Sequence, residues 1–124
     1  MPTLRRQGDL DRIFQNGRWH RFRSVSVGTY MRDDCEPSRF AFIAGGRIGN
    51  AVRRNRSRRR MREALRSMLD EVKPGADVVV LARDATADVQ FESIRGAIRS
   101  SLVSEGLIEE PAADEQRPAT SDSQ

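Results

Sequence analysis

The chain has 124 residues, of which 22 are lysine or arginine and 18 are aspartate or glutamate, and only 37% are hydrophobic. A chain of this length forms one domain with a modest core. It has no apolar run of about 18 residues that could span a membrane, and its N-terminus (MPTLRRQGDL) lacks the apolar segment of a secretory signal. The single Cys35 excludes an internal disulfide and a cysteine-based zinc site, which fits a reducing, cytoplasmic location.

The charge is unevenly distributed along the chain. Residues 109–124 hold five acids and one arginine, a net charge of −4, so residues 1–108 carry a net charge of +8. Between Arg39 and Arg66 ten arginines accompany a single acid, Glu63. Charge concentrated in this way attracts polyanions. Because residues 109–124 are acidic and lack apolar periodicity, we expect them to form a disordered tail on a folded domain of residues 1–108.

A short helix is predicted at residues 8–17 (GDLDRIFQNG). Asp9 is a suitable N-cap residue, and Gly17 is a common residue at a helix end. The residues that share one apolar face at helical spacing are Leu10, Ile13 and Phe14.

Two strands are predicted next. Residues 23–31 (RSVSVGTYM) alternate with period two, which indicates a half-buried strand. If its valines face the core, the opposite face carries short side chains and leaves a groove. A turn at residues 32–38 (RDDCEPS) leads to a short aromatic strand at residues 39–46 (RFAFIAGG). Residues 19–24 form a further strand if they pair separately.

A long helix is predicted from Ala51 to Val72, with Asn50 as its N-cap and Lys-Pro-Gly after it. Its core-facing stripe lies only in the C-terminal half and consists of Met61, Ala64, Leu65, Met68 and Val72. We therefore expect the N-terminal half to project past the core. The arginines expected around it are Arg53, Arg54, Arg56, Arg58, Arg59 and Arg60.

The remaining elements are a strand and a helix. Residues 75–83 (GADVVVLAR) are predicted to form a strand whose run from Val78 to Ala82 is apolar on both faces, as in a strand at the centre of a sheet. The last helix is predicted to start near Asp88. The order of helix, two or three strands, long helix, strand and helix predicts a single small α+β domain, with helices packed on a mixed sheet.

The arginine run indicates a polyanionic partner. Seven of the twelve residues from Ala51 to Arg62 are arginine, and no acid lies between Arg47 and Glu63. Like charges at i,i+4 on a helix repel each other by tenths of a kcal/mol, and a bound anion reverses this penalty. Ordinary solvated helix faces mix both signs of charge. DNA or RNA binding is therefore favoured over a solvated face or a nuclear-localisation signal.

The stretch RIGNAVRRNRSRRRMREAL, residues 47–65, resembles the signature of the bacterial ribonuclease P protein subunit. The matching positions are Arg47, Gly49, Asn50, Ala51, Val52, Arg54, Asn55, Arg56, Arg58, Arg59 and Arg62. The element order extends the resemblance from about Leu4 to Val103.

The resemblance implies a fold like domain 2 of ribosomal protein S5, with a left-handed crossover between parallel strands against the usual rule. It also implies a protein cofactor of a catalytic RNA, in a ribonucleoprotein that removes the 5′ leader of precursor tRNA. The partners implied are that catalytic RNA, precursor tRNA and Mg²⁺ bound with the RNA, with no membrane and no obligate protein partner.

Two sites follow from the resemblance. The long helix is expected to contact the catalytic RNA through Arg47, Asn50, Arg53, Arg54, Asn55, Arg56, Arg58, Arg59 and Arg62. A cleft between the first helix and the sheet is expected to hold the leader, lined by Arg12, Phe14, Arg23 and Tyr30. Phe14 packs against the sheet instead if its helix face is simply core. Gly46 stands where the family is usually basic, so either a phosphate contact is missing or the backbone approaches RNA closely.

We find no residue set for catalysis by the protein alone, which would require metal-binding carboxylates or a general base. The only histidine, His20, either faces RNA or is an ordinary loop residue. The acids of the 32–38 turn are better explained as turn residues than as a metal pair. Trp19 and Phe22 alternate with arginines and either stack on bases or close the core edge. We expect one of these two aromatic side chains to point inward.

Three functions are compared. The leading one is a ribonucleoprotein subunit that does not cleave RNA by itself. The second is a non-catalytic binder of structured RNA, of the ribosomal or chaperone type. The third is a DNA-binding regulator that places a recognition helix in the major groove. A helix with arginine all round it is better suited to phosphates than to base edges, which disfavours the third function.

Overall fold

Four strands form one mixed sheet in the order β1-β2-β4-β3 in a computed structural model that describes residues 1–109. The elements are α1 (Gln7–Asn16), β1 (Arg18–Arg21), β2 (Val25–Met31), β3 (Arg39–Ile43), η1 (Gly46–Ile48), α2 (Ala51–Arg66), η2 (Leu69–Glu71), β4 (Ala76–Ala82) and α3 (Phe91–Ser104). The predicted α+β class and element order are confirmed, including the separate strand at β1. Apart from Glu109, the predicted acidic tail lies outside the described residues.

The strand β4 lies at the centre of the sheet, as its two apolar faces predicted. It pairs antiparallel with β2, from Val25 opposite Ala82 to Met31 opposite Ala76. It pairs in parallel with β3, from Arg39 opposite Asp77 to Ile43 opposite Leu81. Adjacent parallel strands need a crossover connection, and α2 provides it.

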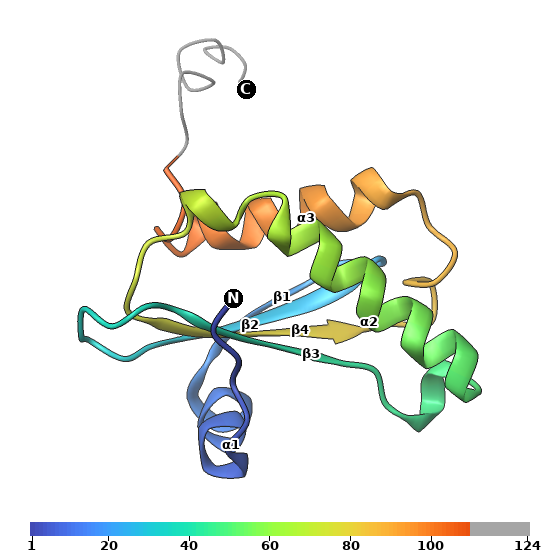
Figure 1. Cartoon of the computed structure of the whole chain (residues 1–124), viewed down its shortest axis with the longest axis horizontal. Coiled ribbons are helices and arrows are strands. Elements are labelled where there is room, and N and C mark those ends of the chain that lie inside the picture. The colour runs from blue at the N-terminus through green and yellow to red at the C-terminus, as the bar shows by residue number, and fades with distance from the viewer. Residues whose placement is uncertain (110–124) are drawn as a thin grey trace, which may run out of the picture.

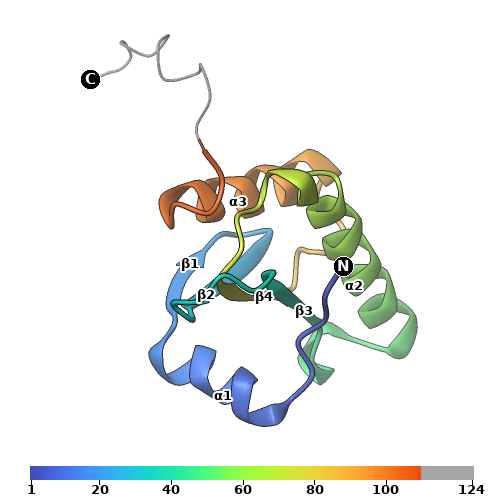
Figure 2. The ribbon, with the colours of Figure 1, turned by 60° about the vertical axis from the view of Figure 1, so that its left-hand side comes forward.

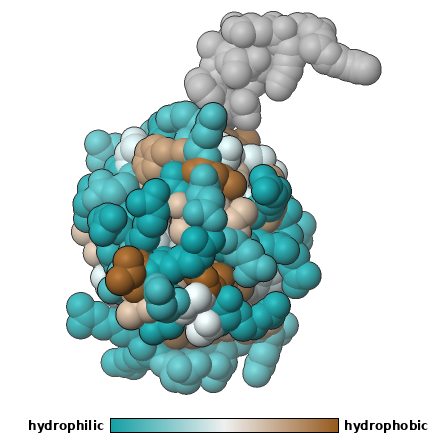
Figure 3. Space-filling model, turned by 90° about the vertical axis from the view of Figure 1, so that its right-hand side faces the viewer, coloured by the Kyte–Doolittle hydropathy of each residue, from teal (hydrophilic) through white to brown (hydrophobic). Residues whose placement is uncertain are grey.

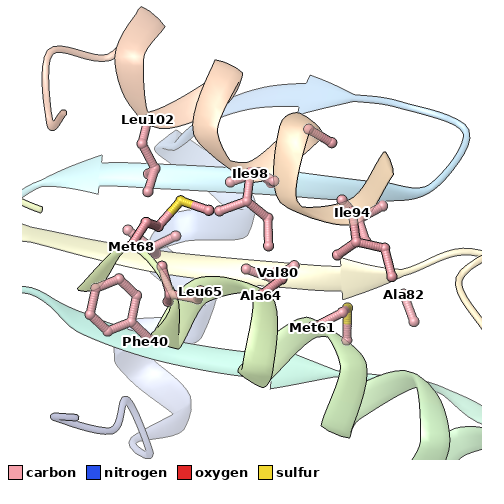
Figure 4. Close-up of a cluster of buried hydrophobic side chains, with 14 of the residues drawn as sticks. Phe40, Met61, Ala64, Leu65, Met68, Val80, Ala82, Ile94, Ile98 and Leu102 are labelled. Atoms are coloured by element: carbon pink, nitrogen blue, oxygen red, sulfur yellow. The ribbon is translucent and has the colours of Figure 1, made fainter. Parts of the chain in front are cut away.

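The helices cover both faces of the sheet. α2 and α3 lie on one face and α1 lies on the other (Figures 1 and 2). The predicted apolar stripe is confirmed at Met61, Ala64, Leu65 and Met68, which are buried against the sheet and α3 (Figure 4). Val72, its last predicted member, lies beyond α2 and is only partly buried. On the α1 face a smaller cluster is formed by Leu4, Ile13, Ala41 and Val79. α1 thus packs through Ile13, while Phe14 stays 47% exposed.

The helix ends differ from their predicted positions. α1 begins at Gln7, so Asp9 lies in its first turn and is not the cap. α2 ends at Arg66 and not at Val72, because Met68 leaves the helical region (φ −125°) and the chain bends into η2. α3 begins at Phe91 and not near Asp88, which belongs to the β4–α3 loop. The predicted cap of α2 is confirmed, since the Asn50 side chain accepts a hydrogen bond from the Arg53 backbone N–H.

A buried ionic cluster anchors the start of β4. The Asp77 side chain is completely buried and accepts hydrogen bonds from Arg32 at 2.7 Å and from Arg39 at 2.8 Å. Arg32 also donates to both carboxylate oxygens of Asp34. The hydrogen bond from Arg32 lowers the pKa of Asp34, and the pKa of Arg32 is raised, first by Asp34 and then by Asp77. The prediction that the acids of the 32–38 turn serve the turn itself is therefore confirmed for Asp34.

Asp77→Asn is expected to lower the free energy of unfolding by about 3–5 kcal/mol, because it leaves Arg32 without its buried counter-charge. Urea denaturation followed by circular dichroism measures the loss. Asp70→Asn, the same change at an exposed position of η2, serves as the control and should stay within about 0.5 kcal/mol of the original protein. Equal losses in the two variants would contradict a stabilising role for the cluster.

Candidate nucleic-acid interface

The arginines of α2 divide between two flanks of the helix. One flank lies beside β3 and is called here the β3-side flank; it consists of Arg54, Asn55, Arg58, Arg59 and Arg62. The Arg62 guanidinium lies 5.5 Å from the centre of the Phe42 ring in β3, and Arg58 donates to Asn55. Arg59 is exposed and makes no hydrogen bond or ion pair with residues 1–109. This flank offers cationic groups to an external partner.

The opposite flank is docked on the β4–α3 loop, residues 83–90. This loop-side flank consists of Arg53, Arg56 and Arg60. Arg53 pairs with Asp88 at 2.6 Å, Arg56 donates to the Ala87 carbonyl at 2.9 Å, and Arg60 donates to the Thr86 and Val89 carbonyls at 2.5 Å each. The expectation that all the arginines surround a projecting half-helix is therefore wrong for these three. The loop comes from far along the chain, so sequence periodicity could not reveal the contact.

Electrostatics agree with this division. The hydrogen bond from Arg53 holds the pKa of the Asp88 carboxyl below its usual range. Burial lowers the pKa of Arg60, and nearby Arg56 adds to the effect. Two arginines of this flank are thus held close together, and Asp88 supplies a nearby opposite charge.

The junction before α2 is built by two residues of the sequence signature. Gly49 has a φ of +132°, and a Cβ there would lie 2.8 Å from the Arg53 side chain. Asn50 then caps the helix. Arg47 is exposed in η1, just before this turn. The first turn of α2 contains no acid, so the positive end of the helix dipole adds to the charge of the arginines there.

A groove of about 1070 Å³ runs along the α1 side of the sheet, next to this junction. Its walls come from α1, the β1–β2 hairpin, the β3–α2 connection and the β4–α3 loop. The lining residues are Phe14, Trp19, Arg21, Arg23, Ser26, residues 45–48, residues 81–85, Asp88 and Val89. The surface around the start of α2 and the β4–α3 loop is mostly hydrophilic, with hydrophobic side chains between the polar ones (Figure 3).

An aromatic pair forms one end of the groove. The rings of Phe14 and Trp19 stack with centroids 5.3 Å apart. Trp19 donates through its indole N–H to the Ile13 carbonyl at 3.3 Å, and its ring covers Gly28, where a Cβ would approach to 2.6 Å. Phe22 packs against the main core. Trp19 packs against the smaller cluster and also lines the groove, so both rings contribute to packing where one was expected to point inward.

The predicted cleft residues fall into two groups. Phe14 and Arg23 line the groove. Arg12 and Tyr30 do not; the Arg12 guanidinium lies 5.5 Å from the centre of the Tyr30 ring. The predicted groove over the small face of β2 is present only in part, because Ser26 lines it but the Trp19 ring covers Gly28. Gly45, Gly46, Arg21 and Arg83 were not predicted as lining residues. The alternation of basic and aromatic residues around Trp19 was the one signal that pointed to this wall.

Other candidate groups belong to the protein's own structure. His20 lies in β1, where its Nε2 is 2.7 Å from a carboxylate oxygen of Glu105. Within residues 1–109, no group of three or more His, Cys, Asp or Glu side chains could hold a metal ion. In the same part of the chain, no helix is long and apolar enough to cross a membrane.

The small mixed sheet, the arginine-bearing crossover helix and the adjacent groove define an RNA-binding α+β protein. Residues 2–104 match the family model described as Ribonuclease P. The chain belongs to the ribonuclease P protein family.

Relatives and solved structures agree with this assignment. The ribonuclease P protein component of Symbiobacterium thermophilum is 34% identical over 97 residues, covering 78% of this chain and 84% of the relative. That of Gluconacetobacter diazotrophicus is 33% identical over 105 residues, covering 84% and 90%. The Staphylococcus aureus RNase P protein shares the fold, with a TM-score of 0.74 at 22% identity over 88% of this chain and 99% of that one. The Thermotoga maritima protein has a TM-score of 0.69 at 25% identity, over 82% and 96%.

Gly28→Ala is expected to displace the Trp19 ring and to lower the free energy of unfolding by about 1–3 kcal/mol, as overpacking does. Trp19 is the only tryptophan, so its fluorescence emission should shift as the ring becomes wetter. Gly8→Ala, in α1 with nothing within 4 Å of the new Cβ, is the control and should leave the emission unchanged. An unshifted emission in Gly28→Ala would refute this packing.

Proposed function

We propose that this chain is the protein component of the ribonuclease P ribonucleoprotein, which binds the catalytic RNA and the 5′ leader of precursor tRNA. The observation that carries the proposal is the adjacency of two surfaces: the β3-side flank of α2, and an aromatic and basic groove that begins at the turn before α2. One surface suits the phosphates of a structured RNA, and the other suits a single strand. Precursor tRNA bound to a catalytic RNA presents both features.

The catalytic RNA is proposed to bind along α2. The residues expected to take part are Arg47, Asn50, Arg54, Asn55, Arg58, Arg59 and Arg62. Arg53 and Arg56, predicted from the sequence for the same role, contact the β4–α3 loop instead. Support is strongest for the exposed Asn55, Arg59 and Arg62. Arginine suits this role because its planar fork makes bidentate contacts with phosphate. We assign RNA binding to residues 1–108 and make no assignment for the acidic remainder.

The leader is proposed to lie in the groove. Bases stack on the Phe14–Trp19 end, and phosphates meet Arg21, Arg23 and Arg47, an arrangement that suits single strands without strict sequence preference. Gly45 and Gly46 carry no side chain beyond a hydrogen and have open space around them, so the RNA backbone can approach closely. Because only precursor tRNA carries a leader, the groove favours precursor over mature tRNA.

Cleavage itself is assigned to the RNA. The described residues offer no metal-holding cluster, and the Mg²⁺ of the reaction is assigned to the RNA component. The protein supplies concentrated positive charge, which offsets repulsion between two RNA molecules and so lowers the need for free cations. A cytoplasmic location is part of the proposal, in keeping with the single exposed cysteine, Cys35.

Cleavage of precursor tRNA by the catalytic RNA of the same organism at low Mg²⁺ is the direct test. Added protein should raise the rate, while protein alone should cleave nothing. If about six phosphates are neutralised, log K for the RNA should fall against log salt with a slope of roughly −4 to −5. Binding without any stimulation would instead favour a structured-RNA binder of the ribosomal or chaperone type.

Phe14→Ala should lower the affinity of the holoenzyme for precursor tRNA by about 5- to 150-fold, the loss of one base stack, and leave mature tRNA binding unchanged. Competition binding with the two RNAs measures the ratio. Met31→Ala is a matched control, because Met31 is 48% exposed, like Phe14, but does not line the groove. An unchanged ratio in a folded Phe14→Ala protein would remove Phe14 from the leader site.

A further inference from the structure

The β4–α3 loop, residues 83–90, forms one wall of the groove and contacts the loop-side flank of α2. Arg83, Asp84, Ala85, Asp88 and Val89 line the groove. The loop has no regular secondary structure, so its backbone carbonyls need hydrogen-bond donors from other parts of the chain. Its shape therefore depends on whatever donates hydrogen bonds to it.

The loop's own turns use only some of its carbonyls. The Arg83 carbonyl accepts from the Thr86 N–H, and the Ala85 carbonyl accepts from the N–H groups of Asp88 and Val89. Arginines of α2 donate hydrogen bonds to the carbonyls of Asp84, Thr86, Ala87 and Val89. Four neutral acceptors that the loop leaves open are thus satisfied by three cationic side chains.

These three side chains come from one flank because of helical spacing. Arg53, Arg56 and Arg60 stand at i, i+3 and i+7, which places them within one stripe of α2. Arg59 and Arg62 fall outside this stripe, and Arg62 lies beside Phe42 in β3. Hydrogen bonds between a charged donor and a carbonyl are stronger than neutral ones, so the loop-side flank is a firm attachment.

The attachment continues to the second wall of the groove. The Thr86 hydroxyl donates to the Ser24 carbonyl at 2.5 Å and accepts from the Arg83 N–H at 2.7 Å. Ser24 follows Arg23, which lines the groove. The loop therefore connects α2 with the hairpin that carries Arg21 and Arg23.

We propose that Arg53, Arg56 and Arg60 are positioning residues that hold the β4–α3 loop in place as a groove wall, while the β3-side flank carries the charge that meets the catalytic RNA. This inference rests on the proposed function and assigns different tasks to neighbouring arginines of one signature. The loop-side arginines act on precursor binding through the loop, without touching the leader.

The test compares Arg60→Gln with Arg59→Gln, the same change at adjacent positions of which Arg60 contacts the loop and Arg59 does not. A glutamine at position 60 cannot reach both carbonyls. We expect Arg60→Gln to speed amide hydrogen exchange in residues 83–90 of the free protein. In the holoenzyme it should lower the precursor-to-mature affinity ratio about tenfold, on the order of one lost nucleotide contact. Its salt slope for binding the catalytic RNA should match that of the original protein.

Arg59→Gln should behave in the opposite way. Its salt slope should fall by about one, as for the loss of one phosphate contact, with loop exchange and the affinity ratio unchanged. The proposal is overturned if Arg60→Gln lowers the slope as Arg59→Gln does while loop exchange stays slow. It is also overturned if Arg60→Gln changes neither exchange nor ratio.

A second variant covers the case in which Arg60→Gln raises exchange throughout the chain. Arg53→Gln then decides by the same criteria, because the Arg53 side chain is 37% exposed and less central to the packing. The proposed function is tested separately, with the original protein. If the holoenzyme containing it shows no preference for precursor tRNA over mature tRNA, the proposed function is contradicted. The exchange measurement on free protein still tests the attachment.

Discussion

The position of β4 is the constraint on which the rest of the structure depends. It is the last strand among residues 1–109, yet it lies between β2 and β3 and is buried on both faces. Parallel pairing with β3 requires a crossover over the sheet, and α2 is that crossover. Since only the C-terminal half of α2 carries buried apolar residues, the arginine-rich half is placed beyond them, beside the end of β3 and the β4–α3 loop. The groove and the arginine helix meet at this end of the sheet.

Most arginines on the two flanks of α2 contact neutral groups of the protein and not carboxylates. Asp88 is the one carboxylate that forms an ion pair with an arginine of either flank among residues 1–109. The other contacts are to backbone carbonyls, the Asn55 side chain and the Phe42 ring. Such contacts fix arginine side chains without cancelling their charge. The helix thus keeps its attraction for phosphate, while three of its eight arginines hold the β4–α3 loop.

The sequence was sufficient to predict what depends on local pattern. Period-two alternation, the apolar stripe from Met61 and the doubly apolar run of β4 led to the right elements and the right central strand. The Arg-Asn-Arg signature led to the right family. These features are encoded by residues close together in the chain.

The errors arose where distant segments meet. The end of α2 at Arg66 depends on how the chain turns to rejoin the core, and residue preferences alone favoured a longer helix. The face of β2 with Gly28 was predicted to be open, because nothing in the sequence placed the Trp19 ring on it. The docking of Arg53, Arg56 and Arg60 could not be distinguished from exposure, since arginine serves both purposes and the loop is about 30 residues further on.

The central position of a late strand also shapes how the protein is made. While the ribosome is still translating residues 1–75, β2 can pair only with β1, and β3 has only the bridge between Thr3 and Phe40. The arginine-rich segment emerges before the strand that closes the sheet beneath it. The complete sheet, and the groove on it, can therefore form only once residues 76–82 are available. A prematurely terminated chain has unpaired strand edges, which favour aggregation, and is not a partly working RNA binder.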